Sequence, residues 1–184
     1  LHDALPICPA GDMVLTGSWD STSRLWSVGS GRLIHTFTGH QDTVKAVAFS
    51  PTGDYILTGS LDGTARLWDV TSPEMLKSLI GHKGAVLALK FSPDGKELLS
   101  GSLDSSLRRW NIALAQPVAT YNEPLSWVRS VAYNSTASKI VAGGDDQIGF
   151  IWDSQTGALL NRLEGHKGWI MSVNFSPDDQ FILT

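Results

Sequence analysis

The sequence contains little cysteine, little charge and no long hydrophobic segment. A single cysteine, Cys8, stands among 184 residues, so no disulfide can form within the chain. The cysteine content therefore gives no reason to place the protein in an oxidising compartment, and we expect an intracellular, cytoplasmic location. No apolar run approaches the roughly 20 residues that a membrane-spanning helix needs, so membrane insertion is not expected.

Charge of either sign is also scarce. Charged residues make up 17% of the chain, and the formal net charge is −4. This balance gives no general attraction to nucleic acid or to an anionic membrane, so neither is expected as a partner. The first residues lack a basic segment followed by an apolar one, so a signal peptide is not expected either. With 42% apolar residues, the composition is typical of a globular protein.

The chain does contain a repeat with a constant period. Four tryptophans are separated by 42 residues in each of the three intervals, without an insertion: Trp26, Trp68, Trp110 and Trp152. A Gly-His pair occurs at the same point of three repeats: Gly39-His40, Gly81-His82 and Gly165-His166. A constant period of this length predicts one supersecondary unit that is repeated along the chain.

Each repeat contains four short strand-like runs. In the second repeat, the runs "VKAVAF" (44–49) and "YILTGS" (55–60) flank the turn "SPTGD", and an Asp-Gly turn precedes "ARLWDV". No segment has helical periodicity, so the sequence predicts an all-β fold. In the first run, the large apolar residues Val44, Val47 and Phe49 break strict alternation, which predicts a β-bulge between the first two.

The Gly-His and Trp-Asp markers, with four strands in about forty residues, resemble the WD-repeat family of β-propellers. The resemblance implies four-stranded antiparallel blades around a common axis, three of them complete and two partial. The expected boundaries are a partial blade at 8–38, complete blades at about 44–80, 86–122 and 128–164, and a partial blade at 165–184. Propellers of this family usually have seven blades, so flanking blades of a longer chain are expected partners of these repeats.

The opening "LHDALPIC" does not fit the repeat. The match to later repeats is good from Pro9 onward and fails before it. The codons CTA CAC GAC GCT CTT CCG ATC would encode residues 1–7, and they resemble the end of a sequencing-library adapter. We therefore interpret residues 1–7 as non-native and Cys8 as an altered serine, since serine occupies this position in other repeats.

The resemblance also implies a buried polar tetrad in each blade. In the family, an Asp orients the His of the Gly-His pair, and a hydroxyl links that His to the indole of the Trp. The second and third repeats supply complete tetrads: His40, Thr58, Asp62 and Trp68, then His82, Ser100, Asp104 and Trp110. The partial repeats supply Thr16, Asp20 and Trp26 at one end, and His166 and Thr184 at the other.

The fourth repeat departs from this pattern. It keeps Asp146 and Trp152, but Pro124 stands at the His position and Ala142 at the hydroxyl position. An unpaired buried polar group costs about 1–3 kcal/mol, so we expect this blade to be locally less stable than its neighbours. Because Pro124 lacks an N–H group, the segment "YNEPLSW" is expected to be an extended loop.

No catalytic or metal site is expected. The three Gly-His histidines lie whole repeats apart, so no short spacing brings two of them to one metal. Ser, His and Asp are present together, but a tryptophan completes each set and no nucleophile elbow accompanies it. We therefore expect a protein that is not an enzyme and that has no cofactor and no metal.

Three tryptophans lie outside the tetrads, and the resemblance places them on one loop-bearing face. Trp127 and Trp169 occupy the same repeat position, and Trp19 precedes the turn residue Asp20. Near them in the repeat stand Lys45, Arg129 and Met171. Trp, Arg and Met are enriched at interface centres, so these six residues are candidate partner-binding residues. In the alternative interpretation, the tryptophans pack against neighbouring loops and only close the top of the sheets.

These observations favour a non-catalytic scaffold for protein or peptide partners. A second interpretation makes the repeats a regulatory or sensor array within a larger protein that carries an NTPase or kinase domain. A third is binding of RNA or glycan through the Trp-bearing face, although the chain lacks a basic stripe.

Overall fold

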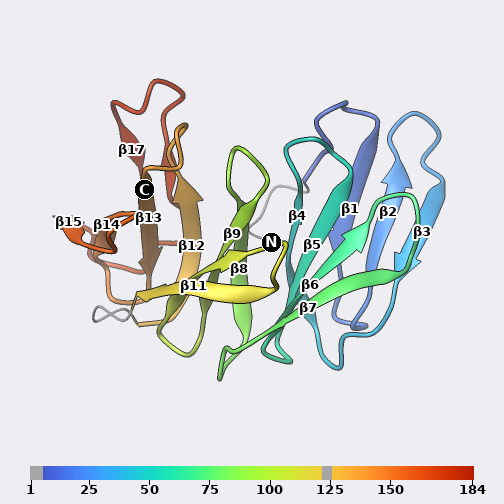
Figure 1. Cartoon of the computed structure of the whole chain (residues 1–184), viewed down its shortest axis with the longest axis horizontal. Coiled ribbons are helices and arrows are strands. Elements are labelled where there is room, and N and C mark those ends of the chain that lie inside the picture. Colours follow the sequence, from blue (N-terminus) through green and yellow to red (C-terminus); the bar gives the residue numbers. More distant parts are fainter. Residues whose placement is uncertain (1–5, 122–125) are drawn as a thin grey trace.

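The computed structural model describes residues 6–121 and 126–184, and this part of the chain contains strands and no helix. The strands form antiparallel sheets that stand side by side along the molecule (Figure 1). The predicted all-β fold of four-stranded antiparallel blades is thereby confirmed.

Three sheets have four strands each, and in each the strands pair in chain order. The second sheet contains β4 (Val44–Phe49), β5 (Tyr55–Ser60), β6 (Thr64–Asp69) and β7 (Met75–Ile80). The third contains β8 (Val86–Phe91), β9 (Glu97–Ser102), β10 (Leu107–Asn111) and β11 (Gln116–Tyr121). The fourth contains β12 (Val128–Tyr133), β13 (Lys139–Gly144), β14 (Gly149–Asp153) and β15 (Leu159–Leu163).

Two smaller sheets lie at the ends of the row. The first sheet contains β1 (Met13–Gly17), β2 (Ser23–Ser27) and β3 (Leu33–Phe37). The fifth contains β16 (Asn174–Phe175) and β17 (Ile182–Leu183). An isolated bridge between Ile7 and Val14 adds a short segment beside β1. The sequence interpretation of residues 1–7 concerns mostly residues 1–5, which lie outside the described residues, as does Pro124.

The first strand of each complete sheet carries a bulge. Its register with the second strand shifts between Val44 and Ala46 in the second sheet, and the third and fourth sheets shift at the equivalent residues. The bulge that the spacing of Val44, Val47 and Phe49 predicts is therefore confirmed. It restores the alternation, so that large apolar side chains on both sides of it reach the core.

The core lies between neighbouring sheets. Trp68, 1% exposed, packs against Phe37 of the first sheet with ring centroids 5.5 Å apart. In the same way, Leu99 and Leu107 of the third sheet share a cluster with Val128 and Val131 of the fourth. Each sheet therefore buries its apolar faces only by stacking on the next, as expected for a repeat protein.

The turn between the first and second strands is closed by one recurring hydrogen bond. A side-chain acceptor at the first turn position receives the backbone N–H five residues later. In four turns the acceptor is an oxygen. The backbone N–H donates from Tyr55 to Ser50, from Glu97 to Ser92, from Lys139 to Asn134 and from Phe181 to Ser176. At the first turn, the sulfur of Cys8 accepts the N–H of Met13 at 3.2 Å. That Cys8 stands in place of serine remains a prediction.

The first strands also line a cavity of about 640 Å³. The strands β4, β8 and β12 come from successive sheets and contact one another in sequence. At one repeat position, every side chain along the cavity wall is small: Ala46, Ala88, Ser130 and Ser172. Short side chains at this position leave the space between the first strands unfilled.

Candidate interaction surface

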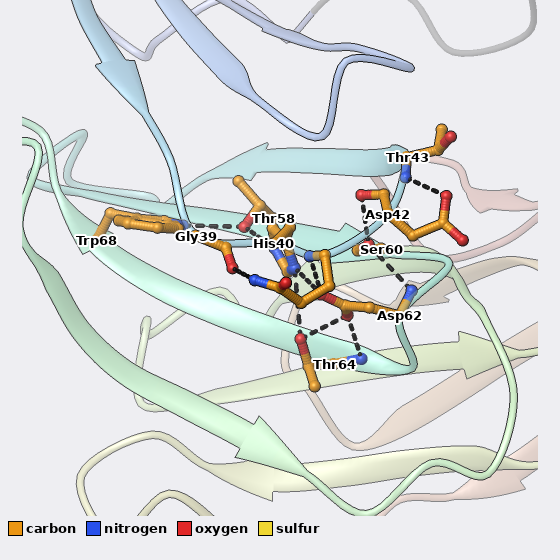
Figure 2. A network of polar contacts seen from close by, with 10 residues as sticks. Gly39, His40, Asp42, Thr43, Thr58, Ser60, Asp62, Thr64 and Trp68 are labelled. Carbon is orange, nitrogen blue, oxygen red and sulfur yellow. Dashed lines mark hydrogen bonds and ion pairs between the residues drawn. The ribbon is translucent and has the colours of Figure 1, made fainter.

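The second sheet contains a complete hydrogen-bonded tetrad. His40 lies in the loop before β4, with Nδ1 2.8 Å from Asp62 Oδ2 and Nε2 2.7 Å from the Thr58 hydroxyl. The indole Nε1 of Trp68 donates to the same hydroxyl at 2.9 Å. Figure 2 shows the imidazole between Asp62 and Thr58, with Trp68 beyond the hydroxyl. Every polar side-chain group of this buried set finds a partner, which is what burial requires.

Glycine is required beside this histidine. Gly39 has a φ of 142°, a conformation that side chains with a Cβ rarely adopt. A Cβ at Gly39 would also collide with the guanidinium of Arg66. The Gly-His pair at Gly39-His40 therefore combines a backbone turn with space for the half-buried Arg66.

The third sheet repeats the arrangement. His82 Nδ1 lies 2.9 Å from Asp104 Oδ2, and its Nε2 lies 2.6 Å from the Ser100 hydroxyl. Trp110 Nε1 donates to Ser100 at 2.8 Å. The guanidinium of Arg108 lies 6.0 Å from the Trp110 ring. The two sheets thus have the same geometry with Ser or Thr as the linking hydroxyl.

Burial and hydrogen bonding together set the pKa values in these tetrads. Burial lowers the pKa of His40 and of His82, although the carboxylates of Asp62 and Asp104 act in the opposite direction. Burial alone would raise the pKa of Asp62, but hydrogen bonds from Thr64, the Gln41 backbone and His40 outweigh it and lower the pKa to about 2. Asp104 is likewise lowered to about 2. The structure therefore favours a neutral imidazole that donates to an ionised carboxylate.

The partial sheets bring together fewer of the sequence-predicted residues. In the first sheet, Trp26 Nε1 donates to Thr16 at 3.0 Å, whereas Asp20 pairs with Arg24 at 2.8 Å. In the fifth sheet, His166 Nε2 lies 2.6 Å from the hydroxyl of Thr184. The hydroxyl of Thr16 thus contacts the Trp of its tetrad, and the hydroxyl of Thr184 contacts the His.

The fourth sheet replaces the polar set by aromatic packing. Trp152 is 1% exposed and stacks on Phe150, with ring centroids 5.8 Å apart and planes 24° apart. Tyr121 covers another side at 5.5 Å. Phe150 stands at the repeat position that Arg66 and Arg108 occupy in the preceding sheets. This substitution was not predicted, although the 42-residue register makes it visible.

Asp146 has no tetrad in the fourth sheet. Both carboxylate oxygens are buried and form no hydrogen bond of normal geometry with the described residues, although the backbone N–H groups of Ser126 and Ile148 act to lower the pKa of this carboxyl. Burial raises the pKa of Asp146, opposite to the direction in Asp62 and Asp104. This carboxylate therefore lacks the partners that keep its counterparts ionised.

A cluster of tryptophan and arginine stands on the same end of the fourth and fifth sheets. The guanidinium carbon of Arg129 lies 5.5 Å from the Trp127 ring and 4.8 Å from the Trp169 ring. Asp145 holds the guanidinium through both Nε and Nη2, the latter at 3.0 Å. We call these four residues, with the adjacent Met171, the tryptophan surface. Trp127 and Trp169 are 45% and 61% exposed, whereas the arginine between them is largely enclosed.

Two other candidate residues lie apart from this surface. Trp19, 88% exposed, belongs to the turn between β1 and β2, and the second and third sheets separate it from Trp127. Lys45 is exposed on β4. Sequence reasoning missed Asp145, although the register places it where Trp19 stands in the first repeat.

Neither a metal-binding cluster nor a membrane-spanning helix is found in the described part of the chain. Within residues 6–121 and 126–184, no three His, Cys, Asp or Glu side chains are grouped closely enough to hold a metal ion. In the same part of the chain, no helix has the length and hydrophobicity to cross a membrane.

The chain is similar to several curated proteins over one to two repeats. It is 39% identical to ribosome assembly protein 4 of Saccharomyces cerevisiae over 49 residues, covering 27% of this chain and 10% of that protein. It is 44% identical to mouse dynein assembly factor with WD repeat domains 1 over 41 residues, covering 22% and 10%. It is 38% identical to the bovine U5 small nuclear ribonucleoprotein 40 kDa protein over 53 residues, covering 29% and 15%.

The aligned segments thus span between 10% and 15% of these relatives' own lengths. The match to the family is broader. Five segments fit the WD domain, G-beta repeat, at residues 4–27, 31–69, 73–111, 115–153 and 157–184. Together with the four-stranded sheets and their tetrads, this match shows that the chain belongs to the WD40 repeat family.

Proposed function

We propose that this protein is a non-catalytic scaffold that binds protein partners through the tryptophan surface. The observation that carries the proposal is the pair of exposed indoles, Trp127 and Trp169, fixed on either side of Arg129. Such a pair presents a large contact area and loses little side-chain conformational entropy on binding, which is typical of interface hot spots.

The family supports the same role. WD40 proteins are generally non-catalytic scaffolds that mediate protein–protein interactions. By their names, two relatives are assembly factors and one is a component of a ribonucleoprotein. We propose a comparable place for this protein in an assembly, inside the cell, with Trp19 and Lys45 as further contacts on the same face.

The test replaces both indoles. We expect the Trp127→Ala, Trp169→Ala double variant to lose binding to the wild-type protein's co-purifying partners by about tenfold or more, because hot-spot tryptophans each contribute about 2 kcal/mol. Quantitative affinity purification measures the loss. The matched control is Tyr55→Ala, which removes an aromatic side chain 41% exposed at the start of β5.

Thermal unfolding of the same variants separates binding from packing. If the double variant unfolds at a much lower temperature and loses no partner that the folded wild type retains, the tryptophans serve the sheets and the proposal fails. A partner set that disappears after nuclease treatment would instead favour RNA.

A further inference from the structure

The cavity between the first strands has the size of a ligand site. Its volume of about 640 Å³ lies within the range of roughly 300–1,000 Å³ that is usual for bound small molecules and side chains. The wall is about equally polar and apolar, and Ser130 and Ser172 provide hydroxyls on it. The space can therefore hold a few residues of an extended chain.

The charges that line this cavity have one sign. Among the described residues, its charged lining side chains are Lys90 of β8 and Arg129 of β12, and neither Asp nor Glu lines it. Lys90 is exposed and makes no ion pair within the described part of the chain. At its repeat position the other copies have Ala48, Ala132 and Asn174. Lys90 is thus an uncompensated cation on the cavity wall.

Arg129 connects the cavity to the tryptophan surface. Asp145 engages two of its nitrogens, Nε and Nη2, and the indoles of Trp127 and Trp169 lie against the guanidinium. A guanidinium has five N–H donors, and within the described residues Nη1 makes no hydrogen bond. The arginine is therefore held in place at the cavity wall while one of its nitrogens keeps its N–H donors free of hydrogen bonds to the described residues.

We propose that the cavity binds an acidic peptide segment of a protein partner, with one carboxylate on Arg129 Nη1 and another on Lys90. The unpaired Lys90 and the free Nη1 of Arg129, on a wall that has no carboxylate among the described residues, are complementary to such a segment, and the serine hydroxyls suit its backbone. The inference rests on the proposed function in that the partner is a protein, and it adds the chemistry of the bound segment.

A nucleic acid fits the same wall less well. Recognition of a phosphate backbone needs a stripe of several cations, whereas this cavity offers two, one of them already paired with Asp145. A short acidic segment needs only the two cations that are present.

The test uses labelled hexaglutamate as the probe and hexaglutamine as the uncharged reference. We expect the protein to bind hexaglutamate more tightly by fluorescence anisotropy. The preference should shrink when the salt concentration rises from about 30 mM to about 150 mM, because exposed charges are then screened. We expect Lys90→Gln to weaken binding about threefold and Lys90→Glu to weaken it further.

Two further variants complete the design. Arg129→Lys keeps the charge but loses the planar fork, and we expect a loss of about tenfold. Arg32→Gln is the matched control, because it removes one exposed cation from the turn before β3 and should leave binding unchanged. Lys90 faces the open cavity, so its variants are expected to fold even if changes at Arg129 disturb the tryptophan surface.

The outcomes separate this inference from the proposed function. Equal binding of the two peptides, or no effect of Lys90→Glu, would overturn it. Tighter binding of hexauridylate than of hexaglutamate would also overturn it, in favour of RNA. If the tryptophan variants keep all partners while Lys90→Glu loses hexaglutamate, the proposed function fails and the acidic-peptide site stands.

Discussion

The third and fourth sheets solve the same packing problem with different chemistry. In the third sheet, Trp110 donates a hydrogen bond to Ser100, and His82 links Ser100 to Asp104. In the fourth, the rings of Phe150 and Tyr121 pack against Trp152. Both tryptophans are at most 1% exposed. The comparison shows that the fold requires a filled volume beside the tryptophan, and that a polar network is one way to fill it.

The difference also has a cost. The polar solution leaves none of its four side chains without a partner, whereas the aromatic one leaves the carboxylate of Asp146 buried without a hydrogen bond to the described residues. A polar group left in this state destabilises the folded protein. The predictions below compare the two sheets directly.

The largest effect is expected at Phe150. Phe150→Ala removes a ring that is 1% exposed and stacked on Trp152, so the free energy of unfolding should fall by about 3 kcal/mol. Arg108→Ala, at the same position of the third sheet, removes mainly a cation–π contact and should cost about 1 kcal/mol. Urea unfolding measures both. Equal costs would show that Phe150 does not replace the polar network.

The hydroxyl that links His and Trp should matter for stability in the third sheet and not in the fourth. Ser100→Ala leaves His82 Nε2 and Trp110 Nε1 without partners and should cost about 2 kcal/mol by urea unfolding. Ala142→Ser introduces the hydroxyl into the fourth sheet, where no His stands in the sequence, and should not stabilise the protein. Ser30→Ala, in an exposed turn, is the control. A stabilising Ala142→Ser would indicate that the fourth sheet retains a place for the network.

The two aspartates should respond with opposite signs. Asp104→Asn weakens hydrogen bonds from His82, Ser106 and Lys83, and we expect a loss of about 1–2 kcal/mol. Asp146→Asn removes a buried charge that has no side-chain hydrogen-bond partner among the described residues, and we expect a gain of up to about 1 kcal/mol at neutral pH. Differential scanning calorimetry at one pH gives both values, and a loss in Asp146→Asn would contradict the comparison.

The smallest effect is a difference in pH dependence. Burial lowers the pKa of His82, so the unfolded chain binds the proton more readily. The stability from the neutral imidazole is therefore complete above about pH 6.5 and is lost as the pH falls below it. Asp146 has a raised pKa, so the fourth sheet gains relative stability as the pH falls.

Hydrogen exchange at two pH values, corrected for intrinsic rates, would detect this divergence. Between pH 7.5 and pH 5.5, protection in β9 and β10 should fall by about twofold to fivefold relative to β13 and β14. Parallel changes in the two sheets would show that the tetrad does not control the local response to acid. The carboxylates of Asp62 and Asp104, with pKa values lowered to about 2, contribute stability that is lost only as the pH falls from about 4 towards 2.

The sequence predicted the fold through its spacing. The 42-residue interval fixed the strands and the bulge after Val44, because repeats place equivalent residues in equivalent environments. The spacing did not predict which side chains form ion pairs or stack on one another. The pair of Arg129 and Asp145 joins β12 to the turn after β13, and only the folded register brings these two residues together. Phe150 and Trp152 both lie on β14, but the stacking of their rings depends on how the side chains pack in the folded sheet. The exposure of Trp127 and Trp169 likewise depends on neighbouring loops, which spacing does not describe.

The turn that joins first and second strands shows what the repeat specifies at a single atom. Sulfur, hydroxyl and amide oxygens occupy the same place in Cys8, Ser50 and Asn134, and each accepts the N–H five residues later. The requirement is thus a lone pair at one point in space rather than one residue type. The turn can consequently accommodate any side chain that places an acceptor there. Alanine or valine would leave the first backbone N–H of the second strand without this hydrogen bond.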